Sequence, residues 1–159
     1  MLRELIGYAL GFVLFILLIP FIMWKVSGPV APRTAQIVAF GILAVAGIGI
    51  SVWSIVYMKL VGKGNPMDAF NHEVAPRTSN LMTEGPYRLC RNPMLLGVFM
   101  YYLGILILLW NVKAGVIFVA FACIMAVQVK REESRLEAEF GDDYREYKKK
   151  TKRIIPFVW

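Results

Sequence analysis

Four long windows of this 159-residue chain contain no Asp, Glu, Lys or Arg, and this pattern restricts the fold more than any other feature. The windows are residues 5–24, 34–58, 92–112 and 114–129. A bilayer core of about 30 Å needs about 20 helical residues, so the first three windows are long enough to cross it. The fourth has 16 residues, but the stems of the flanking Lys113 and Lys130 can reach the interface and extend it.

The composition agrees with a membrane protein. Hydrophobic residues make up 58% of the chain, charged residues only 18%, and the mean hydropathy is +0.58, which lies outside the usual soluble range. A net charge of +7 suits either nucleic acid or the anionic face of a bilayer, and the hydrophobicity selects the bilayer. The first window is too long for a signal peptide and no A-x-A cleavage site follows it, so we interpret it as a retained helix.

We therefore predict an all-α integral membrane protein with about four transmembrane helices. Only residues 111–114 separate the last two windows, which predicts a tight helical hairpin. Gly7-x-x-x-Gly11 and Gly47-x-x-x-Ser51 are pairs of small residues that let helices approach closely, and we expect them to serve packing within one chain rather than a dimer. The sequence does not indicate the oligomeric state.

The charge distribution predicts the orientation. Four crossings place the N-terminus, the 59–91 loop and the C-terminal segment on one side, and that side carries fifteen of the eighteen Lys and Arg residues. The opposite side has only Lys25, Arg33 and Lys113. Because cytoplasmic loops are enriched in Lys and Arg, the large loop and the C-terminal segment are predicted to be cytoplasmic.

The loop before the third window ends in two turn-forming clusters, Gly85-Pro86 and Asn92-Pro93. These bends leave backbone N–H and C=O groups that need partners at the membrane surface, and a bound ligand is one way to supply them. Pro93 is also an ordinary first residue of a helix. A functional and a purely structural interpretation are both open for this loop.

An amphipathic helical segment is predicted after the fourth window. Its apolar stripe contains Val129, Leu136, Phe140, Tyr144 and Tyr147, and Gly141 is expected to interrupt the helix. Glu133 shares this stripe, where a carboxylate is costly unless it meets a cation or hydrogen-bond donors. The alternative to a functional role is that Glu132 and Glu133 pair locally, with partners drawn from Lys130, Arg131 and Arg135.

Together these motifs resemble the isoprenylcysteine carboxyl methyltransferase family and the related phospholipid methyltransferases. The resemblance covers roughly residues 60–157 and rests on three elements at characteristic spacings. These elements are Gly85-Pro86-Tyr87-Arg88 with Arg91-Asn92-Pro93-Met94-x-x-Gly97, then Glu132-Glu133-x-x-Leu136-x-x-x-Phe140-Gly141-x-x-Tyr144-x-x-Tyr147-Lys148, and finally Arg153-x-x-Pro156. Leu95 departs from the family pattern, which usually has Tyr there, and Asn92 stands where eukaryotic members carry His.

The resemblance implies a membrane-embedded, S-adenosylmethionine-dependent methyltransferase that methylates a lipophilic acceptor, with carboxylate O-methylation favoured. It implies catalytic roles for Glu133 and Arg153, and no metal. It places at the cofactor Tyr87, Arg91, Asn92, Pro93, Gly97, Glu132 and Glu133. The chain then divides into two N-terminal helices (1–58), a cytoplasmic loop (59–93), and a hairpin with a cofactor-binding segment (94–157), all in one membrane domain.

Two other functions remain open at the level of sequence. Membrane sterol and steroid reductases, which bind NADPH, have a similar C-terminal layout, although the Glu132-Glu133 pair suits a diphosphate poorly. A catalytically silent membrane scaffold on the same fold is the other alternative. The Asn92-Pro93 motif favours a prokaryotic enzyme of the inner membrane whose active site faces the cytoplasm. The acceptor itself is not indicated.

Overall fold

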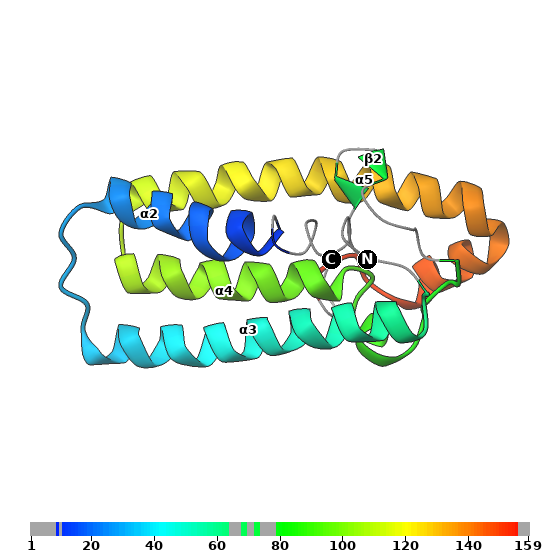
Figure 1. Cartoon of the computed structure of the whole chain (residues 1–159), viewed down its shortest axis with the longest axis horizontal. Coiled ribbons are helices and arrows are strands. Elements are labelled where there is room, and N and C mark those ends of the chain that lie inside the picture. The colour runs from blue at the N-terminus through cyan, green and yellow to red at the C-terminus, as the bar shows by residue number, and fades with distance from the viewer. Residues whose placement is uncertain (1–8, 10, 64–67, 70–71, 74–78, 156–159) are drawn as a thin grey trace.

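The computed structural model describes residues 9, 11–63, 68–69, 72–73 and 79–155 (Figure 1). Within this part the chain is helical apart from one short antiparallel bridge between β1 (Asp68–Ala69) and β2 (His72–Glu73). The helical elements, in chain order, are the π-helix η1 (Phe12–Leu18), α2 (Ile19–Ser27), α3 (Thr34–Leu60), the 3-10 helix η2 (Gly85–Arg88), α4 (Pro93–Leu109) and α5 (Val112–Lys150).

The helices form a bundle of roughly parallel rods. Figure 1 shows α4 in the middle, with α3 along one side of it and α5 on the other, while η1 and α2 fill the space between α4 and α5 at the end where α2 lies. The principal core contains Met23, Tyr102, Ile105, Leu109 and Phe121, contributed by α2, α4 and α5. The all-helical prediction is confirmed.

Two helices are long and apolar enough to cross a bilayer, α3 and α5, each with a window of mean hydropathy 2.2. Only 11% and 17% of those windows are buried within the chain, so these helices are not the core of a soluble domain. Large side chains such as Val45 and Leu60 point away from the bundle. Shorter apolar helices run over Phe12–Ser27 and Pro93–Leu109. The apolar outer surface agrees with a membrane protein, while the number of crossings stays a prediction.

Glycines allow α3 and α4 to approach closely. A Cβ atom added to Gly97 would lie 2.2 Å from the carbonyl oxygen of Gly47 and 2.3 Å from Oγ of Ser51. The Ser51 hydroxyl donates a hydrogen bond of 3.0 Å to the carbonyl of Met94 in the first turn of α4. The predicted use of Gly47 and Ser51 in packing within one chain is confirmed.

The predicted hairpin is present, and its turn is two residues long. Trp110 ends α4 in the left-handed conformation (φ 44°), and Asn111 caps α5 by accepting a hydrogen bond of 2.8 Å from the Lys113 amide. The side chain of Asn111 also donates to the carbonyl of Ser27, which ties the end of α2 to the turn.

The first predicted span is described in part, because residues 1–8 and 10 lie outside the described residues. Its described part contains a feature that the sequence did not predict, the π-helix η1. Two tyrosines of α4 donate to backbone carbonyls in η1, Tyr102 to Phe15 at 2.8 Å and Tyr101 to Ile16 at 3.3 Å. These hydroxyls supply donors within an otherwise apolar part of the bundle.

Gly141 breaks the helical geometry inside α5 (φ 53°, ψ −123°), as predicted. Exposed ion pairs span the break, since Glu137 contacts Arg145 at 3.2 Å and Lys148 at 2.9 Å. The part of α5 after Gly141 turns back toward the bundle (Figure 1) and brings Tyr144 and Tyr147 into a buried position. The predicted apolar stripe therefore faces protein.

Candidate active site

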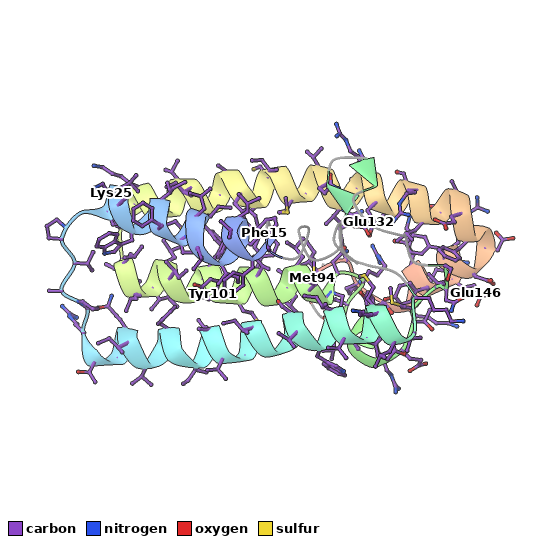
Figure 2. All side chains as sticks on the ribbon, in the orientation of Figure 1. Phe15, Lys25, Met94, Tyr101, Glu132 and Glu146 are labelled. Carbon is purple, nitrogen blue, oxygen red and sulfur yellow. The ribbon has the colours of Figure 1, made fainter. Side chains whose placement is uncertain are left out.

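Three segments far apart in sequence meet at one end of the bundle: η2 with the loop after it, α5 beyond its apolar part, and residues 151–153. In Figure 2, Glu132 on α5 and Met94 at the start of α4 both lie on the side of the bundle away from Lys25, which marks the end where α2 finishes. The segments that carry the three sequence motifs are thus neighbours in space.

Backbone hydrogen bonds join the loop to the C-terminal segment. The amide of Arg91 donates to the carbonyl of Lys152 at 2.8 Å, and the amide of Asn92 donates to the carbonyl of Arg153 at 3.1 Å. The side-chain amide of Asn92 donates to the same Arg153 carbonyl at 3.0 Å. These contacts use the backbone groups that the two bends leave outside regular helix, so their partners lie within the chain.

Glu133 lies between two arginines. Its Oε1 accepts from Nε and Nη2 of Arg91 at 2.9 and 2.7 Å. Its Oε2 accepts from Nε and Nη2 of Arg153 at 3.0 and 2.7 Å. The Glu133 and Arg91 side chains are 7% and 9% exposed, whereas Arg153 is 31% exposed. This arrangement, the Arg91–Glu133–Arg153 triad, satisfies a buried carboxylate by charge-assisted hydrogen bonds.

The triad keeps Glu133 ionised. Burial alone raises the pKa of the carboxyl group, but the hydrogen bonds and charges of Arg153 and Arg91 outweigh burial and hold the pKa below its ordinary value. The same carboxylate raises the pKa of Arg153 through their hydrogen bonds. Glu133 is therefore anionic at neutral pH and does not act as a general acid in this arrangement.

Arg91 also binds the end of α5. Its Nη1 donates to the carbonyl of Lys148 at 3.3 Å and to the carbonyl of Thr151. Carbonyls at a helix C-terminus lack partners within the helix, and a cation there interacts favourably with the helix dipole. One guanidinium thus connects the loop before α4, the carboxylate on α5 and the helix end after Gly141.

A layer of tyrosines packs beside the triad. Tyr87, Tyr144 and Tyr147 are buried together with Met82, and the Tyr147 hydroxyl donates to the carbonyl of Tyr87 at 2.6 Å. Burial, more than neighbouring charge, raises the pKa of all three phenols. They are neutral and can supply aromatic faces and hydroxyl groups but not a base.

The predicted site residues are not all at this junction. Arg91, Asn92, Glu133 and Arg153 meet there, and Tyr87 lies next to them. Pro93 is buried as the first residue of α4, following an Asn92 with non-helical dihedrals. Gly97 lies at the contact between α3 and α4.

The local-pairing alternative is right for one glutamate and wrong for the other. Glu132 is partly exposed and lies 3.7 Å from Arg135, one helical turn away. Glu133 instead finds Arg91 and Arg153, 42 and 20 residues away in sequence. Its side chain points into the protein, so the neighbouring cations on the outer face of α5 are replaced by partners from other segments.

Other reactive groups at this end are few among the described residues. Cys90 is fully buried, and burial raises the pKa of its thiol to about 11, so it is not an activated nucleophile. Within residues 11–63 and 79–155, no three His, Cys, Asp or Glu side chains are grouped so that they could hold a metal ion.

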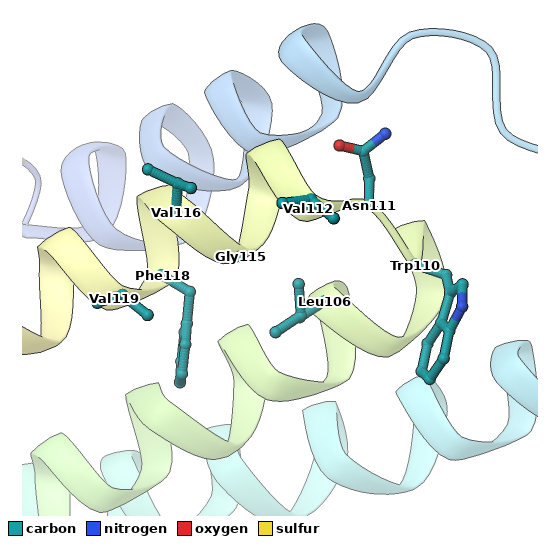
Figure 3. Close-up of a pocket in the computed structure, with 8 residues that line it drawn as sticks. All are labelled: Leu106, Trp110, Asn111, Val112, Gly115, Val116, Phe118 and Val119. Carbon is teal, nitrogen blue, oxygen red and sulfur yellow. The ribbon is translucent and has the colours of Figure 1, made fainter.

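An apolar groove of about 660 Å³ lies at the opposite end of the hairpin, around the turn between α4 and α5 (Figure 3). Figure 3 shows Phe118 and Leu106 facing one another across it, with Trp110 at its edge. Its lining is almost wholly apolar, with Asn111 as the polar exception. This groove has no catalytic group and is separate from the triad.

The fold and the site define a class: a helical membrane protein with a polar, arginine-rich junction at one end of the bundle. Comparison with known proteins makes the class specific. A family model described as phospholipid methyltransferase matches residues 35–143, which is more than half of the chain. The chain belongs to the phospholipid methyltransferase family.

Curated relatives carry another name of the same general class. The chain is 32% identical over 93 residues to the protein-S-isoprenylcysteine O-methyltransferase of Mus musculus, a match covering 56% of this chain and 33% of that protein. Its namesake from Schizosaccharomyces pombe is 32% identical over 94 residues, 57% of this chain and 40% of the relative. The match thus spans only a third to two fifths of these relatives' length. No solved structure matches the chain.

Proposed function

We propose that this protein is an S-adenosylmethionine-dependent methyltransferase of the membrane that acts on a lipophilic acceptor. The observation that carries the proposal is the meeting of the motif segments at one junction, where Arg91, Asn92, Glu133 and Arg153 are linked directly to one another. Family membership supports the same reaction class. Neither a reductase nor a silent scaffold is favoured by any specific contact at this junction.

The chemistry of the junction fits this cofactor. When bound, S-adenosylmethionine supplies a methyl group on a sulfonium, and it carries an ammonium, a carboxylate and ribose hydroxyls besides. The triad contains two guanidinium groups and one carboxylate, so it has a surplus positive charge that suits a bound carboxylate. Glu132 is a partly exposed carboxylate that suits an ammonium or a hydroxyl.

We therefore place the cofactor beside Tyr87 and the triad, with the predicted set of Tyr87, Arg91, Asn92, Pro93, Gly97, Glu132 and Glu133 around it. Arg153 and Glu133 stay the proposed catalytic pair. Gly97 and Pro93 contribute by setting the path of α4 close to α3. Because Arg153 is the most exposed member of the triad, it is the one positioned to meet a ligand from solvent.

The proposed reaction does not need a general base at this site. A carboxylate acceptor has no proton to lose when its oxygen is methylated, and such a displacement depends on alignment and desolvation. The tyrosines at the junction are neutral and Glu133 is occupied, which agrees with a site that orients reactants. O-methylation of a carboxylate is therefore the favoured reaction, as in the relatives named isoprenylcysteine O-methyltransferases.

We further propose four membrane crossings, with the 59–93 loop and the segment after residue 129 on the cytoplasmic side, as in a prokaryotic inner-membrane protein. The fifteen basic residues on that side support this orientation. A cysteine placed at Thr78 should react with an impermeant maleimide only after the membrane is opened. Labelling from outside intact cells would contradict the orientation.

Equilibrium binding of labelled S-adenosylmethionine to the purified protein in detergent tests the proposed function. We expect saturable binding that S-adenosylhomocysteine competes and NADPH does not. Glu139→Gln is a matched control, because Glu139 is an exposed carboxylate on the same helix that pairs with Arg135 at 3.4 Å. Binding of NADPH instead would indicate the reductase, and binding of neither would indicate the scaffold.

A further inference from the structure

The geometry points to a role for Glu133 that differs from direct contact with the cofactor. We propose that Glu133 is a positioning residue whose carboxylate fastens residues 151–155, the C-terminal strap, to the loop before α4, and so builds one wall of the cofactor pocket. This inference rests on the proposed function for the identity of the pocket. The fastening itself concerns only contacts within the chain.

The first argument is the acceptor capacity of the carboxylate. An ionised Glu has two oxygens and about four acceptor positions. Both oxygens of Glu133 accept two hydrogen bonds each, all from Arg91 and Arg153. A ribose hydroxyl or an ammonium could bind Glu133 only by displacing one of these charge-assisted bonds. The residue is therefore fully used by the protein.

The second argument is what the strap would lose. Arg91 is held independently, because its Nη1 donates to the carbonyls of Lys148 and Thr151. The Arg153 side chain is fastened to the bundle through Glu133. Apart from that tie, the strap is held by its backbone bonds to residues 91 and 92 and by the buried side chains of Thr151 and Ile154.

The third argument is charge. Two guanidinium groups approach the same carboxylate from opposite oxygens, so they face each other with only Glu133 between them. Removing the negative charge leaves two buried or half-buried cations without compensation, which is strongly unfavourable. A glutamine at position 133 offers one acceptor oxygen and turns its NH₂ toward the donors of the other arginine. It can hold one arginine at most, and the exposed Arg153 should be the one released.

The test measures strap mobility without any cofactor. A spin label is attached at Ile155→Cys, which is exposed, in a Cys123→Ser background; the buried Cys90 is checked by a sample lacking the Ile155 change. We expect an immobilised spectrum in the parent and a predominantly mobile one in Glu133→Gln, with Glu139→Gln unchanged from the parent. Glu133→Asp, which keeps the charge but is too short to reach both arginines, should fall between them.

Arg153→Met provides a second route to the same state, from the strap side of the contact. We expect it to mobilise the label as Glu133→Gln does, and the double variant to be no more mobile than either single variant. Affinity for labelled S-adenosylmethionine should fall about tenfold or more in each single variant and no further in the double variant.

The two parts of the inference fail separately. A strap that stays immobile in both Glu133→Gln and Arg153→Met overturns the fastening, whatever the cofactor affinity does. A mobile strap with additive losses of affinity would show that Glu133 contacts the cofactor itself and overturn the positioning role. If the parent binds no S-adenosylmethionine, the proposed function fails, while the spin-label result still decides whether Glu133 fastens the strap.

Discussion

The contact between α3 and α4 gives a sharp prediction about stability. In Gly97→Ala, the new Cβ would lie 2.2 Å from the carbonyl oxygen of Gly47 and 2.3 Å from Oγ of Ser51, where ordinary contact begins at 3.4 Å. The Gly47 oxygen is backbone and cannot rotate away, so the helices must separate by about an ångström. Overpacking of this kind costs about 1–3 kcal/mol.

The separation should also cost the hydrogen bond from Ser51 to the Met94 carbonyl, worth about 1 kcal/mol. The expected loss for Gly97→Ala is therefore about 3 kcal/mol, or roughly 10 °C in melting temperature for a chain of this size. Gly49→Ala is the matched control, since nothing lies within 4 Å of a Cβ there. Alanine is a better helix former than glycine, so this control should be neutral or up to about 1 kcal/mol more stable.

Thermal unfolding of the cofactor-free protein in detergent measures both variants. Leaving the cofactor out matters because Gly97 also belongs to the proposed cofactor-binding set. If Gly97→Ala melts at the same temperature as the parent, or if Gly49→Ala is as damaging, then α3 and α4 are not in the close contact described here.

Three further predictions concern other contacts. Arg153→Lys should lower turnover without changing liposome association, because lysine has no planar fork, whereas Lys149→Ala should weaken association and spare turnover; wild-type turnover in the Arg153 variant would remove it from the site. Tyr102→Phe should destabilise the protein by about 1 kcal/mol in thermal unfolding through loss of its hydrogen bond to the Phe15 carbonyl. The pKa of Glu133 is lowered in the folded state, so its contribution to stability is present above the unfolded value near 4.5 and is lost as pH falls through the folded value. Unfolding followed from pH 7 to 3 should show this loss in the parent and not in Glu133→Gln.

Much of the fold could be predicted from local patterns. Uncharged windows predicted the apolar helices, Asn111 with its neighbours predicted the hairpin turn, and Gly141 predicted the interruption of α5. Each of these signals acts within a few residues, through hydrophobicity, capping or a positive φ. The π-helix η1 left no such signal, because its carbonyls are satisfied by Tyr101 and Tyr102, 85 and 87 residues away in sequence.

The candidate site shows the same limit. Helical spacing correctly suggested a local partner for Glu132, because Arg135 is one turn away. It could not suggest Arg91 and Arg153 for Glu133, since those contacts depend on the break at Gly141 and on the strap returning to the loop before α4. The one signal in the sequence was a carboxylate within an apolar stripe, which predicts a partner but not its identity.

The central claim is that the junction around the triad supports methyl transfer to a lipophilic acceptor. The most direct test incubates the purified protein, reconstituted in liposomes made from bacterial lipid extract, with methyl-labelled S-adenosylmethionine and measures label in the organic-extractable fraction. The account predicts incorporation that is retained in Glu139→Gln and lost in Arg153→Met. Incorporation that is equal in Arg153→Met and the parent would contradict the assignment of the reaction to this junction.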